Sequence, residues 1–355
     1  MAVACSTGSS GEVATELTAT IDAWRERTPA PAVVVAVAGP AIGEHLIASG
    51  TLHRDAADPA AVRTPFRAAS ITKMLVATVV LQLVEEGRVR LDGFVGEARR
   101  GSGDGLDSML DGVRVRDLLR HTSGLPDSAR SPRLVDLLKS DPGAQWTTER
   151  VLTMVSESEP EFPPATAFGY SNTNYLVLGE IIEGATGNTW WEEARARILD
   201  PLDMVDSYMA GFEPRRGPIA PGYFDLDNDG FTEELDPHWP ALETTEGAAG
   251  ALVSTAPDLL RFAQGLFSGN LLSEATLQEM TTPGPFSSRH TGYGLGVEVS
   301  KPDLATTVWG HGGFLPGYRA ILWHAPDPGV TVVVWTNESR SRPDGLAELA
   351  LRIAK

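Results

Sequence analysis

The chain has 355 residues, of which 42% are hydrophobic and 21% are charged. These values are ordinary for a folded protein, and the length allows one large domain or two closely packed ones. The net charge of −18, without a Lys/Arg cluster, argues against nucleic acid or an anionic membrane surface as a partner, and no apolar run approaches the roughly 20 residues that span a bilayer.

The first residues form a candidate export and anchoring segment. Residues 1–10 have the composition of a disordered spacer, and Cys5, the only cysteine, excludes a disulfide within the chain. Small residues precede Cys5 and a Ser/Gly stretch follows it, which resembles the lipid-attachment site of an exported bacterial lipoprotein, although this sequence shows no signal peptide. We therefore expect an exported, extracellular or cell-envelope protein with Cys5 as a candidate lipid anchor; the alternative is an incidental cysteine.

A helix and a hairpin follow. Apolar residues recur at helical spacing over 11–27, which predicts a helix. Two apolar runs, over 33–38 and 45–49, flank the Gly39-Pro40 turn and predict a β-hairpin.

The next segment carries a serine and a lysine at the front of a long apolar run. Ser70 and Lys73 begin a run that ends before Gly87 and predicts a mostly buried helix, with both side chains on one face. A helix N-terminus offers free N–H groups, which could hold an oxyanion while the serine attacks a carbonyl. Only four of the 29 basic residues are lysines, and lysine, unlike arginine, can lose its proton. The use of a lysine at position 73 therefore favours a role in proton transfer. The alternative is a capping serine and a surface charge.

The rest of the chain is first helical and then strand-rich. Helices are predicted over 115–119, 134–139, 148–157, 175–183 and 190–199, before a long loop region over 211–242. A helix from Pro257 to Phe267, strands over 294–299, 306–309, 319–323 and 330–335, and a helix over 345–353 complete the chain.

This order predicts an α+β fold with three layers (αβα). Short links between the late strands favour an antiparallel sheet, and the simplest solution builds that sheet from both chain ends, flanked by helices, with a mostly helical lobe inserted. We expect a sheet domain over 11–66 and 243–355, an inserted domain over 67–242, and a catalytic cleft between them.

Three short motifs occur in a fixed order: Ser-x-x-Lys at 70–73, Tyr-x-Asn at 170–172 and His-Gly-Gly at 311–313. Together with flanking stretches such as 121–126, they resemble the serine β-lactamase and penicillin-binding-protein-like superfamily. The matching branch holds class C β-lactamases, D-alanyl-D-alanine carboxypeptidases, esterases and D-aminopeptidases. The resemblance covers about 16–350, nearly the whole chain.

The motif residues suggest a proton-transfer system. A free tyrosine has a pKa of about 10, and the Lys73 ammonium would lower that of Tyr170. The two groups would then share a proton taken from Ser70 and pass it to the leaving group. Asn172 can bond both the Lys73 amine and a substrate carbonyl. A Ser-His-Asp triad is not expected, because the chain has no Gly-x-Ser-x-Gly turn.

The third motif bears on the substrate. The resemblance implies an oxyanion hole from the backbone N–H groups of Ser70 and Phe314, and Gly312 and Gly313 would let an extended substrate lie along the strand edge. His311 and Gly312 replace the usual Lys and Thr, which weakens carboxylate recognition. Efficient β-lactam hydrolysis is therefore not expected.

One acidic loop has the pattern of a calcium site. Residues 225–230 place Asp at the first, third and fifth positions and Gly at the sixth, with Asp236 at the twelfth, where Glu is usual. Because no helices are predicted on either side, a polar turn is preferred, and no metal or cofactor is expected.

We therefore predict a serine hydrolase that forms an acyl-enzyme on Ser70, most simply a D-alanyl-D-alanine carboxypeptidase-like peptidase. A carboxylesterase or a weak class C-like β-lactamase is the alternative of the same class, and a non-catalytic penicillin-binding-like scaffold that of another. The expected partner is a small molecule or peptide: a D-alanyl peptide, an ester or a β-lactam.

Overall fold

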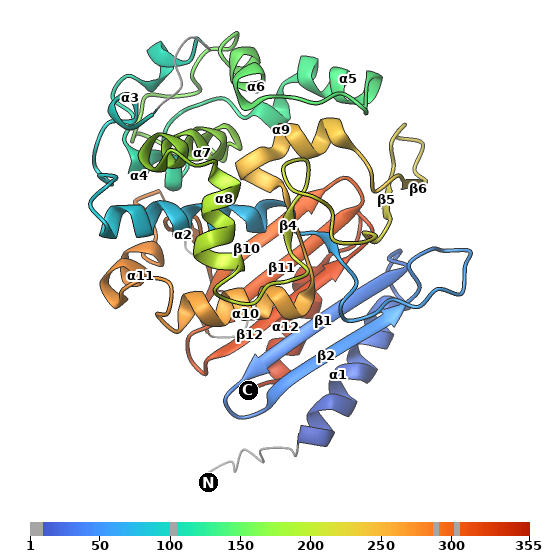
Figure 1. The fold of residues 1–355 in the computed structure, drawn as a ribbon. Helices are drawn as coiled ribbons and strands as arrows, with labels where there is room; N and C mark the ends of the chain where they lie inside the picture. Colours follow the sequence, from blue (N-terminus) through green and yellow to red (C-terminus); the bar gives the residue numbers. More distant parts are fainter. Residues whose placement is uncertain (1–9, 100–104, 287–290, 302–305) are drawn as a thin grey trace.

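A seven-stranded antiparallel sheet is the centre of the computed structural model, which describes residues 10–99, 105–286, 291–301 and 306–355 (Figure 1). Both chain ends supply its strands, as predicted, because the N-terminal hairpin pairs with the last strand. In spatial order the strands are β2 (Gly43–Gly50), β1 (Ala32–Gly39), β12 (Val330–Thr336), β11 (Tyr318–Ala325), β10 (Val308–Leu315), β9 (Glu298–Ser300) and β8 (Thr291–Tyr293).

Helices cover both faces of the sheet, which confirms the predicted three-layer α+β fold. Strand β1 is buried on both faces: Val33, Val35 and Val37 pack with the first and last helices, whereas Val34 and Ala36 pack into the larger core on the other face. This two-sided burial explains the unbroken apolar run of β1. The covering helices are α1 (Ser10–Arg25) and α12 (Pro343–Ile353) on one face, and α2 (Thr72–Glu85) and α10 (Ala256–Phe267) on the other.

A mostly helical region lies between β2 and α10 in the chain and contains every helix that the sequence predicted there. Its helices are α3 (Val95–Ala98), α4 (Val115–Leu119), α5 (Pro132–Ser140), α6 (Thr148–Val155), α7 (Thr173–Thr186), α8 (Trp190–Ala194), which continues as a π-helix (Arg195–Leu199), and α9 (Pro240–Gly250). The predicted inserted domain over 67–242 stays a proposal, because α9 packs on α2 and α10 packs on the sheet within one continuous core.

Several short elements were not predicted. Helix α9 begins within the loop region assigned to 211–242, and it is kinked at Gly247, which has non-helical backbone angles. The other helices and strands missed are α3, α11 (Glu274–Met280) and the short strands β3 (Phe66–Arg67), β4 (Tyr208–Met209), β5 (Gly222–Phe224), β6 (Glu233–Leu235), β7 (Leu252–Ser254) and β8.

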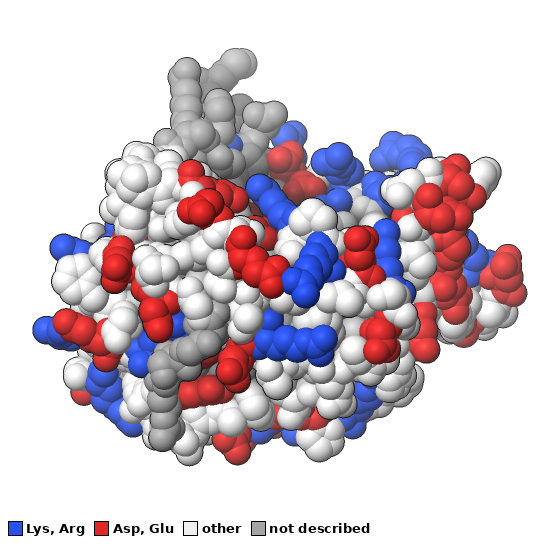
Figure 2. Space-filling view, turned by 90° about the horizontal axis from the view of Figure 1, so that it is seen from above, with Lys and Arg blue, Asp and Glu red and all other residues white. Residues whose placement is uncertain are grey.

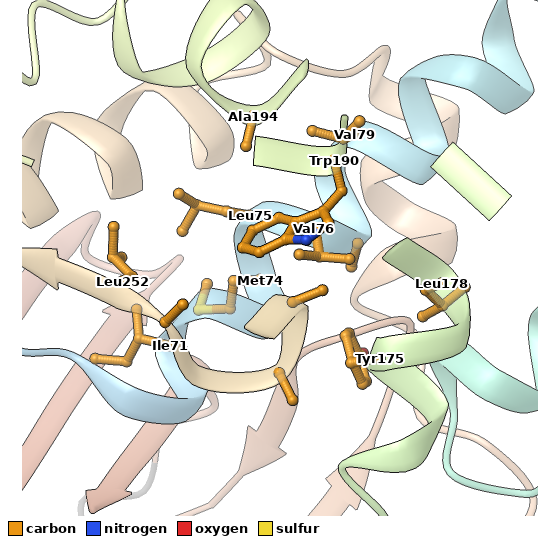
Figure 3. Close-up of a cluster of buried hydrophobic side chains, with 14 of the residues drawn as sticks. Ile71, Met74, Leu75, Val76, Val79, Tyr175, Leu178, Trp190, Ala194 and Leu252 are labelled. Carbon is orange, nitrogen blue, oxygen red and sulfur yellow. The ribbon is translucent and has the colours of Figure 1, made fainter. Parts of the chain in front are cut away.

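Helix α2 is buried along most of its length, which accounts for its apolar sequence (Figure 3). Its Met74, Leu75 and Val79 lie among side chains of the neighbouring helices and of β7. The labelled neighbours in the figure are Tyr175 and Leu178 of α7, Trp190 and Ala194 of α8, and Leu252 of β7. The helix ends before Gly87, which adopts a left-handed conformation (φ 71°).

Three predicted positions need correction. Ser70 lies in a 3-10 turn, Ala69–Ile71, that precedes α2 and not in the first turn of α2. His311 lies in the middle of β10 and not at a strand end, because glycines 312 and 313 remain extended and paired with β11. The strand predicted over 294–299 is a turn at Gly296 (φ 81°) between β8 and β9.

The surface and the termini add two observations. On the face seen in Figure 2, acidic and basic side chains are interspersed despite the net negative charge. No helix among the described residues is long and apolar enough to cross a membrane. Cys5 and the rest of the predicted spacer, except Ser10, lie outside the described residues.

Candidate active site

A cavity of about 600 Å³ brings the three motifs together. Its walls come from α5, α9, β10 and β11 and from the turn that carries Ser70. The predicted site residues that line it are Ser70, Tyr170, Asn172, His311, Gly312, Gly313 and Phe314. Lys73, the remaining one, lies completely buried behind the cavity wall and contacts Ser70.

The turn before α2 holds Ser70 in a strained but well-fixed backbone. Ala69 has φ 51°, a conformation that costs energy for a residue with a Cβ and is typical of functional sites. The hydroxyl of Thr72 donates to the Ala69 carbonyl at 2.6 Å and accepts the Leu252 N–H at 3.0 Å, which ties the turn to β7. These bonds fix the direction in which Ser70 enters the cavity.

Lys73 is the most constrained side chain of the site. Its Nζ donates to Ser70 Oγ at 3.1 Å and to Asn172 Oδ1 at 2.6 Å, and to the Ala249 carbonyl at 2.8 Å. Burial lowers the pKa of Lys73 to about 8, and nearby carboxylates, above all that of Glu246, oppose this shift. About a tenth of Lys73 is therefore neutral at pH 7, far more than for an exposed lysine, and this form can accept the proton of Ser70.

Tyr170 differs from the expectation. Burial raises its pKa well above the usual 10, and a hydrogen bond with Ser70 lowers it only in part. The Lys73 ammonium, 5.1 Å from the ring centre, does not make Tyr170 a phenolate in the free protein. The prediction of a lowered tyrosine pKa is therefore wrong, because desolvation of the phenolate outweighs the neighbouring charge. Neutral Tyr170 can still relay a proton through its hydroxyl.

Asn172 is oriented by the segment that precedes α5. Its backbone N–H donates to Asp127 Oδ1 at 2.9 Å, and its Oδ1 is occupied by Lys73, so its Nδ2 remains for a substrate carbonyl. His121 is completely buried, and its Nδ1 accepts the Ser171 N–H at 3.2 Å. Burial lowers the pKa of His121 well below 6.5, so this neutral ring supports the Tyr-x-Asn motif from within.

His311 is neutral and fixed in one tautomer. Its Nδ1 lies 2.5 Å from the Gly312 carbonyl, which can only accept, so Nδ1 carries the proton and Nε2 accepts from the Tyr293 hydroxyl at 2.9 Å. Burial lowers the pKa of His311 to about 3. Tyr293 was not found from the sequence because it belongs to none of the three motifs.

The edge of β10 beside the cavity is open beyond Gly310. Pairing with β9 covers only Val308, Trp309 and Gly310 among the described residues, so the third motif faces the cavity without a partner strand. Here Gly313 lies against the Ser70 turn: a Cβ on Gly313 would stand 2.4 Å from the Ala68 carbonyl oxygen. The segments that carry the two expected oxyanion donors, Ser70 and Phe314, therefore meet, and their role stays a prediction.

Acidic residues add to the negative character of the site. The Glu298 side chain keeps some exposure, yet the surrounding protein raises its pKa to about 7, and it accepts the Gly312 N–H.

In the loop with the calcium-site pattern, the ligand oxygens of Asp225, Asp227 and Asp229 lie within 4.8 Å of one another, but Asp236 is not part of this cluster. The three carboxylates accept backbone N–H bonds of their own loop, as in a polar turn.

The chain is similar to proteins of known families. The family model described as Beta-lactamase matches residues 17–354. Penicillin-binding protein 4 of Amycolatopsis lactamdurans is 28% identical over 88% of this chain and 84% of its own, and Esterase EstB of Burkholderia gladioli is 28% identical over 86% of both. The crystal structure of D-amino acid amidase from Ochrobactrum anthropi SV3, complexed with L-phenylalanine amide, is 26% identical with a TM-score of 0.83 and covers 97% of this chain and 98% of its own.

Proposed function

Because the chain belongs to the beta-lactamase family, we propose that it hydrolyses amide bonds that follow a D-amino acid, through an acyl-enzyme on Ser70. Family membership confirms the resemblance carried by the three motifs and supports a serine hydrolase. The choice of a D-amino acid follows the D-amino acid amidase and the carboxypeptidase predicted from the sequence, since both would place a D-residue on the serine.

The contact between Lys73 and Ser70 is the observation that carries this proposal. Neutral Lys73 takes the proton of Ser70 along the 3.1 Å hydrogen bond while Oγ attacks the carbonyl carbon. The backbone N–H groups of Ser70 and Phe314 would hold the resulting oxyanion. As the C–N bond breaks, the proton passes through the Tyr170 hydroxyl to the leaving nitrogen. A water molecule then attacks the ester with the same groups acting as base, and the acid product leaves.

The D-alanyl-D-alanine carboxypeptidase predicted from the sequence is one form of this activity. Its substrate ends in a carboxylate, which requires a cation in the cavity. His311 is neutral and cannot supply it. Arg319 can: it lines the cavity, its guanidinium lies 4.2 Å from the centre of the Phe314 ring, and it forms no ion pair among the described residues.

An esterase or weak β-lactamase is the second candidate. Apolar side chains form much of the cavity wall, which suits a small ester, and Esterase EstB is among the relatives. A scaffold without turnover is disfavoured, because a buried lysine within hydrogen-bond distance of a serine is costly to maintain without chemistry. Export and a lipid anchor at Cys5 remain part of the proposal.

A labelling experiment tests the nucleophile. The wild-type protein is mixed with a fluorescent penicillin, D-phenylalanine amide and p-nitrophenyl acetate, and Ser70 is examined for an adduct by mass spectrometry. Ser70→Ala should abolish labelling and turnover of all three while the melting temperature stays nearly unchanged. Labelling that persists in Ser70→Ala would refute the proposed nucleophile.

A further inference from the structure

Glu246 is an acidic side chain that lines the cavity and takes no part in the proposed acyl transfer to Ser70. It lies on α9, and its partly buried carboxylate forms no hydrogen bond or ion pair among the described residues. The other acids near Ser70 are engaged: Asp127 accepts the N–H groups of Ala129 and Asn172, and Glu298 accepts that of Gly312. Glu246 therefore has acceptor oxygens available for a ligand.

The position of Glu246 is fixed by the two ends of α9. One turn before it, Glu243 forms a buried ion pair with Arg67 at 2.6 Å. Three residues after it, the Ala249 carbonyl accepts a hydrogen bond from Lys73. Between them the backbone bends at Gly247 (φ 41°, ψ −131°). Glu246 is thus held on a rigid support next to the amine that activates the serine.

Lys73 is close to Glu246 but does not neutralise it through a hydrogen bond. Among the charged groups around Lys73, Glu246 affects the pKa of its amine most strongly. The ammonium has three donors, and Ser70, Asn172 and the Ala249 carbonyl occupy all of them. The Glu246 carboxylate is therefore left facing the cavity, with burial raising its pKa to about 7. A cation that enters the cavity would stabilise its charged form.

The bound substrate can supply this cation close to the serine. In an amino acid amide with a free N-terminus, the α-nitrogen is only two bonds from the carbon that Ser70 attacks. Its ammonium must then lie near Lys73, where a second positive charge is unfavourable unless a carboxylate compensates. Glu246 is placed to compensate it, and the additional positive charge would favour the neutral form of Lys73 that accepts the proton.

We propose that Glu246 binds the free α-ammonium group of the substrate, so that the enzyme prefers D-amino acid amides and D-peptides with an unblocked N-terminus over N-acylated ones. This inference rests on the proposed hydrolysis at Ser70. Within the proposed hydrolysis, it predicts the substrate selectivity of an amidase or aminopeptidase that requires a free α-ammonium group.

The test compares D-alanine p-nitroanilide with N-acetyl-D-alanine p-nitroanilide. The wild type should have the higher kcat/KM on the free amine. Glu246→Gln should lower kcat/KM on the free amine by about 10- to 100-fold, the range for a hydrogen bond to a charged group, and change it less than about threefold on the acetylated substrate. Asp344→Asn is the matched control, because Asp344 is an exposed acid at the outer wall of the same cavity; it should leave both values unchanged.

The outcomes separate the two proposals. Equal losses on both substrates with a shifted pH profile would mean that Glu246 acts only on Lys73, and would overturn the inference. A wild-type preference for the acetylated substrate would overturn it without any variant, so the test does not depend on the folding of Glu246→Gln. Absence of Ser70-dependent hydrolysis of both anilides and of p-nitrophenyl acetate would instead reject the proposed function itself.

Discussion

Gly313 of β10 lies directly against Ala68 at the start of the Ser70 turn, so that a Cβ on Gly313 would stand 2.4 Å from the Ala68 carbonyl oxygen. Residues 245 positions apart in the chain thereby set the distance between the serine and the third motif. Because Ala69 next to this contact already has an unfavourable φ, the turn has little freedom to move away.

Gly313→Ala should therefore push β10 away from the serine turn. We expect kcat/KM to fall by about 100-fold, since a shift of about 1 Å in the reacting groups has this effect, and the melting temperature to decrease. Gly312→Ala is the control for stability, because its Cβ would meet Ile321 Cδ1 at an ordinary 3.7 Å. Equal melting temperatures for wild type and Gly313→Ala would contradict the close contact.

The pH dependence of the reaction should report Lys73. The base must be neutral, and burial lowers its pKa to about 8, so kcat/KM should fall about tenfold per pH unit below that value and level off above it. p-Nitrophenyl acetate is the suitable substrate because it carries no ionising group, with the rate of Ser70→Ala subtracted. Lys73→Arg keeps the charge but cannot release the proton, and should lose about 10²- to 10⁴-fold. A flat profile between pH 6 and 9 would reject Lys73 as the base.

Folding stability should decrease in acid through His311. Its pKa is about 3 when folded and about 6.5 in an unfolded chain, so between these values only the unfolded state binds the proton. The stabilisation is complete above pH 6.5 and is lost as the pH falls toward 3. In urea titrations, the difference in unfolding free energy between wild type and His311→Gln should shrink by about 2 kcal/mol from pH 7.5 to pH 5. Parallel pH curves for the two proteins would show that His311 has the same pKa in the folded and unfolded states.

Local patterns were sufficient to predict the main elements and the three motifs. The run of β1 is apolar because both faces of that strand are covered, and α2 is apolar because it is buried along most of its length; both patterns are visible in sequence. The state of Tyr170 was not predictable, because its raised pKa depends on burial by distant segments. Glu246 and Tyr293 lie outside the motifs and join the site only through folding. Sequence therefore identified the motif residues that line the candidate site and missed the residues that surround them.

Arg319 offers the sharpest test between carboxypeptidase and amidase activity. It lies opposite Phe314 across the β10–β11 pair, and its Nε donates to the Ser339 carbonyl at 2.9 Å, which leaves the other nitrogens for a carboxylate. If the protein is a carboxypeptidase, Arg319→Gln should raise KM for an acyl-D-alanyl-D-alanine peptide about 10- to 100-fold, because a charge-assisted bond to the terminal carboxylate is lost. D-Phenylalanine amide, which has no carboxylate, should be hydrolysed at the wild-type rate and serves as the internal control. Equal effects on both substrates would assign Arg319 a structural role through Phe314, and rapid turnover of the amide with none of the dipeptide would remove carboxypeptidase activity from the proposal.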